Sequence, residues 1–168
     1  MRHAAKPNMP PPSSGPLSFP LPVVLDTNVV LDVLVFDDPV TRPLGAGLRE
    51  GALIAWADGD TLLELERVLP LPAFKLAEPA RREVFARYRG LVRLASEAPS
   101  APVPELPRCR DRDDQMFLIL TARVGAAWLV SKDKRVLSLA DRHGLPFEIL
   151  TPKQAAQRLQ TTSVVPDG

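Results

Sequence analysis

Leu21-Pro22-Val23-Val24-Leu25, followed at once by Asp26-Thr27-Asn28, joins an apolar run to a polar one. Consecutive apolar residues with β-branched side chains are typical of a parallel strand that is buried on both faces. The abrupt change to polar residues indicates that this strand ends at the rim of a sheet. Asp26 is therefore expected at the carboxyl end of the first strand.

Strand and helix patterns alternate along the rest of the chain. Apolar runs at 52–56, 128–130 and 147–150 predict three more buried strands. Periodic apolar positions and helix-ending residues predict helices over 29–35, 40–50, 58–69, 78–93, 111–124, 134–142 and 152–159. This alternation predicts an α/β fold, a three-layer α/β/α sandwich around a central parallel sheet. In such sheets, functional residues lie beyond the carboxyl ends of the strands.

Composition limits the domain count and the class of protein. With 168 residues, 45% of them hydrophobic, the chain fits one domain with a substantial core. A net charge of +1 excludes a global basic field, so nucleic-acid binding would have to be local. The single Cys109 excludes an intramolecular disulfide and a cysteine-rich zinc site. Neither a signal peptide nor a membrane-spanning segment is apparent, so the expected location is cytoplasmic.

The two ends of the chain differ in composition from the middle. Residues 1–20 contain six of the 19 prolines together with Ser13, Ser14 and Gly15, a composition that does not form a packed core. We expect a disordered proline-rich leader over 1–20, the folded domain over 21–160 and a flexible tail over 161–168.

Acidic side chains collect at the predicted carboxyl rim of the sheet. Asp26 and Asp133 each follow a strand, while Asp111, Asp113 and Asp114 begin a helix. Each of these acids is also suited to capping a helix or to its first turn. Several carboxylates at one rim repel one another unless cations or protons neutralise them, and a shared metal ion is the simpler remedy. Oxygen ligands without a usable His or Cys indicate Mg²⁺ or Mn²⁺.

Four motifs in series resemble the PIN-domain family. They are Val24-Leu25-Asp26-Thr27-Asn28-Val29, Glu64-Leu65-Glu66-Arg67-Val68-Leu69, Asp111-Arg112-Asp113-Asp114-Gln115 and Leu129-Val130-Ser131-Lys132-Asp133. More narrowly, the chain is similar to the bacterial branch of toxin components of toxin–antitoxin pairs. The resemblance covers about residues 22–160 and implies a PIN-like α/β/α fold. It also implies RNA as substrate, an antitoxin protein as partner and, as is common in the family, a homodimer.

The resemblance also implies a catalytic site. Its catalytic and metal-binding acids would be Asp26, Glu64, Asp114 and Asp133. Asp111 matches a further metal-binding acid that is common in this branch, and Ser131 matches a small hydroxyl residue near the metal. Lys132 stands where glycine is more usual. A lysine there could contact a substrate phosphate, or it could neutralise a carboxylate and weaken metal binding.

Helix geometry alone does not decide between two glutamates. With Leu65 at the centre of the apolar stripe, Glu64 and Glu66 lie about 100° away on opposite flanks. Only the family register favours Glu64. Thr27 and Asn28 are equally suited to capping a helix and to orienting Asp26 as supporting residues.

A basic stripe is predicted on the helix that begins at Glu78. Arg82, Arg89 and Arg93 share one face of this helix and are candidates for binding RNA phosphates. A solvated helix face with no binding role is the other interpretation.

Together these features predict a metal-dependent ribonuclease that hydrolyses phosphodiester bonds. Because of Lys132, a catalytically weak PIN-like module that binds nucleic acid or protein is an alternative. An aspartyl-phosphate phosphatase with Asp26 as nucleophile is a third possibility, although such enzymes usually have a second acid two residues on, where this chain has Asn28.

Overall fold

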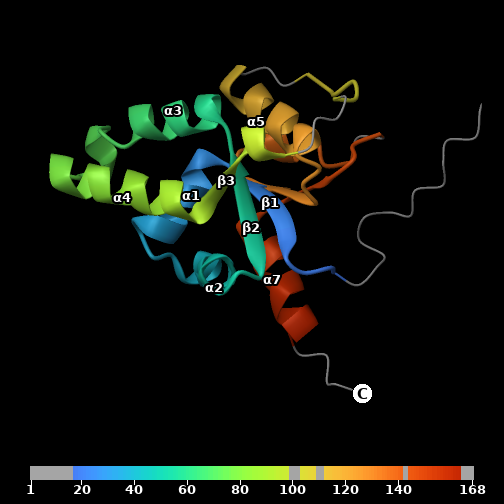
Figure 1. The fold of residues 1–168 in the computed structure, drawn as a ribbon, viewed down its shortest axis with the longest axis horizontal. Coiled ribbons are helices and arrows are strands. Elements are labelled where there is room, and N and C mark those ends of the chain that lie inside the picture. Colours follow the sequence, from blue (N-terminus) through green and yellow to red (C-terminus); the bar gives the residue numbers. More distant parts are fainter. Residues whose placement is uncertain (1–16, 99–102, 109–111, 142–143, 164–168) are drawn as a thin grey trace, which may run out of the picture.

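The chain folds around a five-stranded parallel sheet. The computed structural model describes residues 17–98, 103–108, 112–141 and 144–163 of the chain (Figure 1). The strands are β1 (Leu21–Leu25), β2 (Leu53–Ala57), β3 (Val92–Leu94), β4 (Trp128–Val130) and β5 (Glu148–Leu150). Their order in the sheet is β3-β2-β1-β4-β5, and every neighbouring pair is parallel.

Helices connect the strands and cover both faces of the sheet. The α-helices are α1 (Thr27–Leu34), α2 (Arg42–Glu50), α3 (Gly59–Val68), α4 (Glu78–Leu91), α5 (Arg112–Arg123), α6 (Lys134–Leu137) and α7 (Pro152–Ser163). The 3₁₀ turns are η2 (Pro39–Thr41), η3 (Pro72–Phe74) and η4 (Ala95–Glu97). In Figure 1, α3 and α4 lie side by side, and α2 lies beside α7. None of the helices in the described part of the chain is long and apolar enough to cross a membrane.

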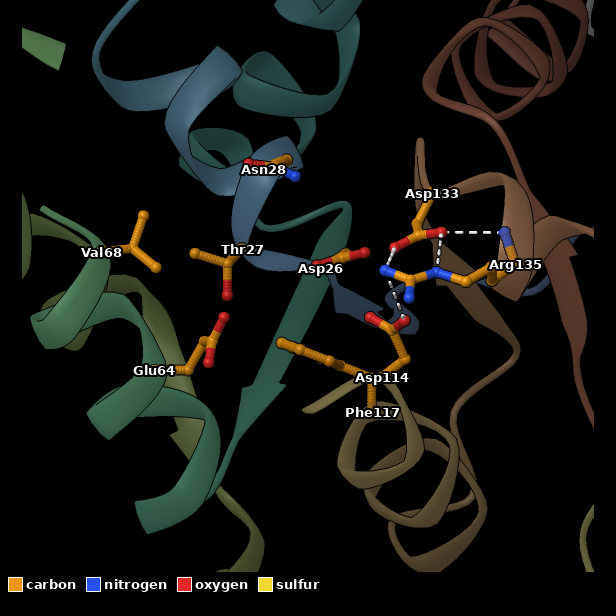
Figure 2. A pocket seen from close by; sticks show the side chains of 9 residues that line it. All are labelled: Asp26, Thr27, Asn28, Glu64, Val68, Asp114, Phe117, Asp133 and Arg135. Atoms are coloured by element: carbon orange, nitrogen blue, oxygen red, sulfur yellow. Dashed lines mark hydrogen bonds and ion pairs between the residues drawn. The ribbon is translucent and has the colours of Figure 1, made fainter. Parts of the chain in front are cut away.

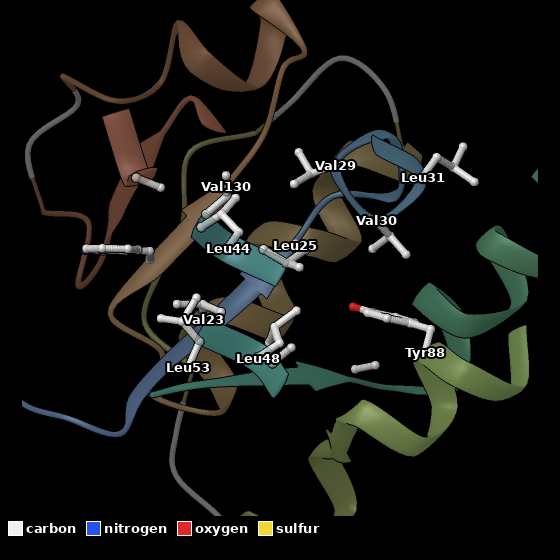
Figure 3. Close-up of a cluster of buried hydrophobic side chains, with 14 of the residues drawn as sticks. Val23, Leu25, Val29, Val30, Leu31, Leu44, Leu48, Leu53, Tyr88 and Val130 are labelled. Atoms are coloured by element: carbon white, nitrogen blue, oxygen red, sulfur yellow. The ribbon is translucent and has the colours of Figure 1, made fainter. Parts of the chain in front are cut away.

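Alternating side chains of β1 build two separate cores. Val23 and Leu25 point into a core shared with α1, α2, α3, α4 and α7 (Figure 3), whereas Val24 joins a second core with α5 and α6. Both faces of the strand are therefore covered, which explains its unbroken apolar sequence. The predicted three-layer α/β/α sandwich with a central parallel sheet is confirmed.

Three sequence-based expectations about the elements were wrong. The helix predicted over 78–93 ends at Leu91, and the next three residues form the edge strand β3, so Arg93 lies in a strand. The helix predicted over 134–142 ends at Leu137. Beyond it, Leu139 and Ala140 donate backbone hydrogen bonds three residues back, as in a 3₁₀ turn, and Ser138 Oγ donates to the backbone oxygen of Arg135. The terminal helix, predicted over 152–159, continues to Ser163.

The order of the strands determines where the chain can build a site. From β1 the chain proceeds to β2 and β3 on one side and then returns to place β4 and β5 on the other. The carboxyl ends of β1 and β4 therefore flank a topological switch point, where open parallel sheets leave a crevice. A backbone hydrogen bond of 3.0 Å from Asp26 N–H to the Val130 carbonyl ties the two strand ends together.

Candidate active site

A pocket of about 170 Å³ opens at this switch point. Its lining consists of Asp26, Thr27, Asn28, Glu64, Val68, Asp114, Phe117, Asp133 and Arg135 (Figure 2). Asp26 precedes α1, Glu64 lies in α3, Asp114 lies in the first turn of α5, and Asp133 precedes α6. The four acids predicted from the sequence thus come from four different elements and face one pocket.

Asp26 is a buried carboxylate whose side chain does not cap its helix. It occupies the N-cap position of α1 and is 7% exposed, but no hydrogen bond joins its side chain to the first turn. Instead, Ser131 Oγ–H donates to Asp26 Oδ2 across 2.7 Å. Burial raises the pKa of Asp26 above its usual value and the negative charge of Asp133 adds to the shift, while the Ser131 hydroxyl and the backbone N–H groups of Thr27 and Asn28 partly oppose it.

Ser131 links two of the acids. Its Oγ donates to Asp26 and accepts the backbone N–H of Asp133 across 3.0 Å. Asp133 in turn caps α6, because its Oδ1 accepts the backbone N–H of Arg135 across 2.8 Å. The hydroxyl predicted near the site therefore fixes the carboxylate of Asp26 and the loop that carries Asp133.

Arg135 is a pocket residue that the sequence patterns did not identify. One of its terminal guanidinium nitrogens lies 3.4 Å from Asp133 Oδ2 and 3.8 Å from Asp114 Oδ2. Burial raises the pKa of Asp133, but hydrogen bonds from the backbone and side chain of Arg135, the positive charge of Arg135 and a side-chain hydrogen bond with Asp114 outweigh burial and lower that pKa overall. Its position two residues after Asp133, at the start of a helix, is the only sequence signal that could have suggested it.

The structure separates the two candidate glutamates. Glu64 lines the pocket together with Val68, one helical turn further along α3. Glu66 is exposed and does not belong to the lining. Val68 and Phe117 give the pocket apolar walls between the acids. Thr27 and Asn28 also line the pocket beside Asp26, and their supporting role stays a prediction.

Lys132 is bound to an acid outside the pocket. Its Nζ lies 2.6 Å from Oδ2 of Asp32 in α1, a carboxylate that is buried, whereas the Lys132 side chain is half-exposed. Within the described residues that Asp32 oxygen accepts no hydrogen bond, so the ion pair is what compensates its charge. Lys132 therefore neutralises a carboxylate, but not one of the four in the pocket.

The remaining predicted residues lie away from the pocket or outside the described part of the chain. Arg82 and Arg89 are exposed on α4, and Arg82 pairs with Glu78. Arg93 is exposed in β3, so the three arginines do not form one helical stripe. Asp111 lies outside the described residues. A role for these residues in binding RNA or metal stays a prediction.

The donor set of the pocket suits a hard divalent cation. Asp26 is buried and, within the described chain, forms no ion pair, so a cation beside it would relieve the cost of its charge. The pocket offers carboxylate oxygens without His or Cys, as Mg²⁺ and Mn²⁺ prefer. Among the described residues, however, no three such side chains converge closely enough to hold a metal in this arrangement.

Comparison with known proteins identifies the family. Residues 22–135 match the sequence profile of the PIN domain. The chain belongs to the PIN-domain family. PIN domains are typically nucleases and generally use divalent metal ions, which supports a nuclease role. The family also argues against the phosphatase alternative, which rested on the first strand alone.

A solved structure shares the PIN fold of this chain. It is the crystal structure of PAE2754 from Pyrobaculum aerophilum, with a TM-score of 0.54 and 12% sequence identity. The similarity covers 84% of this PIN domain chain and 91% of the other, and at this identity it shows the fold alone. No curated protein matches the chain.

Proposed function

We propose that this PIN domain is a Mg²⁺- or Mn²⁺-dependent endoribonuclease that hydrolyses phosphodiester bonds in RNA. The observation that supports it is the gathering of Asp26, Glu64, Asp114 and Asp133 from four elements around one pocket. Helix capping explains only part of this arrangement: Asp133 caps α6, but the Asp26 side chain has no capping hydrogen bond and Glu64 lies inside a helix. Carboxylates at the switch point of a parallel sheet lie where such sheets bind ligands, and they could hold a metal ion there.

The proposed mechanism assigns a role to each acid. Asp26 and Asp114 would hold the metal, with Glu64 and Asp133 contributing directly or through water. The bound metal would activate a water molecule and stabilise the charge on the scissile phosphate. Ser131 holds one Asp26 oxygen in place. The attacking group is water, so no covalent enzyme intermediate forms.

RNA cleavage by the purified full-length protein tests this proposal. We expect cleavage with Mg²⁺ or Mn²⁺, none with EDTA, and a loss of about 100-fold or more in Asp26→Asn. Asp58→Asn is the matched control, because Asp58 caps α3 through Thr61 and does not line the pocket. Absence of cleavage by the metal-loaded wild type would contradict the nuclease proposal.

One observation favours a second candidate, a catalytically weak module that binds nucleic acid or protein. Arg135 already lies against two of the four acids, and the described carboxylates do not converge on a metal position. Under this alternative the wild type binds RNA in a salt-dependent manner but does not cleave it when metal is added, and Asp26→Asn behaves in the same way.

The toxin role is a further part of the proposal and rests on the four-motif resemblance. A short antitoxin gene should lie beside this one, and its protein should cover the acidic pocket and inhibit cleavage in the cytoplasm. An isolated gene would contradict the toxin role but not the nuclease. A homodimer is also proposed on the resemblance, and light scattering of the purified chain tests it.

A further inference from the structure

The Arg135 guanidinium lies between two carboxylates of the pocket. It reaches from α6 to Asp133, two residues earlier in the sequence, and to Asp114 on the separate helix α5 (Figure 2). The contacts of 3.4 Å and 3.8 Å are longer than the 2.7–2.9 Å typical of charge-assisted hydrogen bonds. These two long contacts place the Arg135 charge where it offsets the charge of both acids.

The partners differ in how easily they can move. The Arg135 side chain is 55% exposed, whereas the side chains of Asp114 and Asp133 are 11% and 23% exposed. Releasing the arginine costs little on its own side, because water solvates the exposed guanidinium, whereas the two less exposed acids need another cation in its place. The guanidinium can therefore turn out into solvent, while the two acids stay where α5 and α6 hold them.

We infer that Arg135 is a resident counter-ion of the acid pocket, which a divalent metal must displace in order to bind at Asp114 and Asp133. This inference rests on the proposed metal site. A guanidinium and a divalent ion cannot share the same carboxylate oxygens without strong repulsion between them. A molecule in which the arginine occupies the acids cannot bind metal there. The apparent affinity for metal is therefore lower than the intrinsic affinity, in proportion to the share of molecules in which the arginine has left the acids.

Calorimetric titration with Mn²⁺ alone tests the inference. We expect Arg135→Gln to bind Mn²⁺ about three- to tenfold more tightly than the wild type, the range expected for breaking exposed ion pairs. Lys134→Gln is the matched control, because it removes the same charge one residue earlier and Lys134 has no ion pair within the described chain. We expect Lys134→Gln to change the affinity less than about twofold. Arg135→Lys, with a single charged nitrogen, should fall between wild type and Arg135→Gln.

Each outcome of the titration has a distinct meaning. Equal Mn²⁺ affinities for Arg135→Gln and Lys134→Gln, or weaker binding by Arg135→Gln, would overturn the counter-ion role while leaving the metal site intact. Absence of Mn²⁺ binding in the wild type and in all three variants of Arg135 and Lys134 would overturn both this inference and the proposed function. Circular dichroism of each variant in EDTA checks that the fold is retained. If Arg135→Gln does not fold, Arg135→Lys carries the test.

Discussion

Ser131 Oγ donates a 2.7 Å hydrogen bond to Asp26 Oδ2, across 105 positions of sequence. The bond joins the carboxyl ends of β4 and β1, the two strands that flank the switch point. Ser131 Oγ also accepts the backbone N–H of Asp133. The Ser131 hydroxyl therefore orients both the Asp26 carboxylate and the loop that carries Asp133. These two hydrogen bonds explain the presence of a small hydroxyl residue at position 131 without any contact to a metal.

Replacing Ser131 tests this link through the pH dependence of cleavage. The Ser131 hydrogen bond lowers the pKa of Asp26, so Ser131→Ala should raise it further. If ionised Asp26 is required, the acidic limb of the pH profile of kcat/KM moves to higher pH, and activity at neutral pH falls about tenfold. Ser131→Thr keeps the hydroxyl and should leave the limb unchanged. An unshifted limb in Ser131→Ala would argue against the link.

The buried charge of Asp26 predicts a pH-dependent stability difference. Its pKa is raised in the folded protein, so its contribution is favourable below the usual value of 3.8 and is lost as the pH rises through the folded pKa. In EDTA, Asp26→Asn should therefore be more stable than the wild type at neutral pH, and the difference should shrink toward pH 4. Urea unfolding at several pH values measures it.

Asp133 provides a control, because removing its charge should change the stability at neutral pH in the opposite direction to Asp26→Asn. Its pKa is lowered by Arg135, so its contribution is present at neutral pH and is lost as the pH falls through the folded pKa. Asp133→Asn should consequently be less stable than the wild type at neutral pH. If both variants changed stability in the same direction, the electrostatic account of the pocket would be wrong.

Glu64 and Glu66 form a matched pair for testing the site. Both lie in α3 with the same side chain, but only Glu64 lines the pocket. We expect Glu64→Gln to reduce metal-dependent cleavage by about 10-fold or more and Glu66→Gln to leave it within about twofold. Cleavage rates at saturating Mn²⁺ measure the effect. Equal losses in the two variants would indicate a general effect of charge rather than a role in the pocket.

Sequence patterns located the acids that follow strands because parallel topology brings strand ends together. A buried run that ends in Asp26, and another that ends just before Ser131, are enough to predict a common rim. Glu64 was harder, since a helix offers two flanks and only the folded chain shows that the flank of Glu64, and not that of Glu66, faces the pocket. Which flank faces the pocket depends on packing between distant segments, which periodicity does not record.

The features that the sequence did not predict are short or depend on contacts between distant residues. Edge strand β3 has three residues and follows α4 directly, so Val92 also fitted the apolar stripe of the helix. Arg135 contacts Asp114 only because α5 and α6 meet at the pocket. The partner of Lys132, Asp32, lies 100 positions earlier inside a helix, where an isolated acid carries no signal for a specific cation.

The ion pair between Lys132 and Asp32 leads to the last prediction. Lys132→Ala leaves a buried carboxylate without its cation and should lower the free energy of unfolding by about 1–2 kcal/mol, after allowance for the half-exposed lysine. Adding Asp32→Asn to this variant removes the uncompensated charge and should restore most of the loss. Urea unfolding of the wild type, both single variants and the double variant measures the coupling. If Lys132→Ala kept its stability but bound RNA more weakly, Lys132 would instead be a phosphate contact.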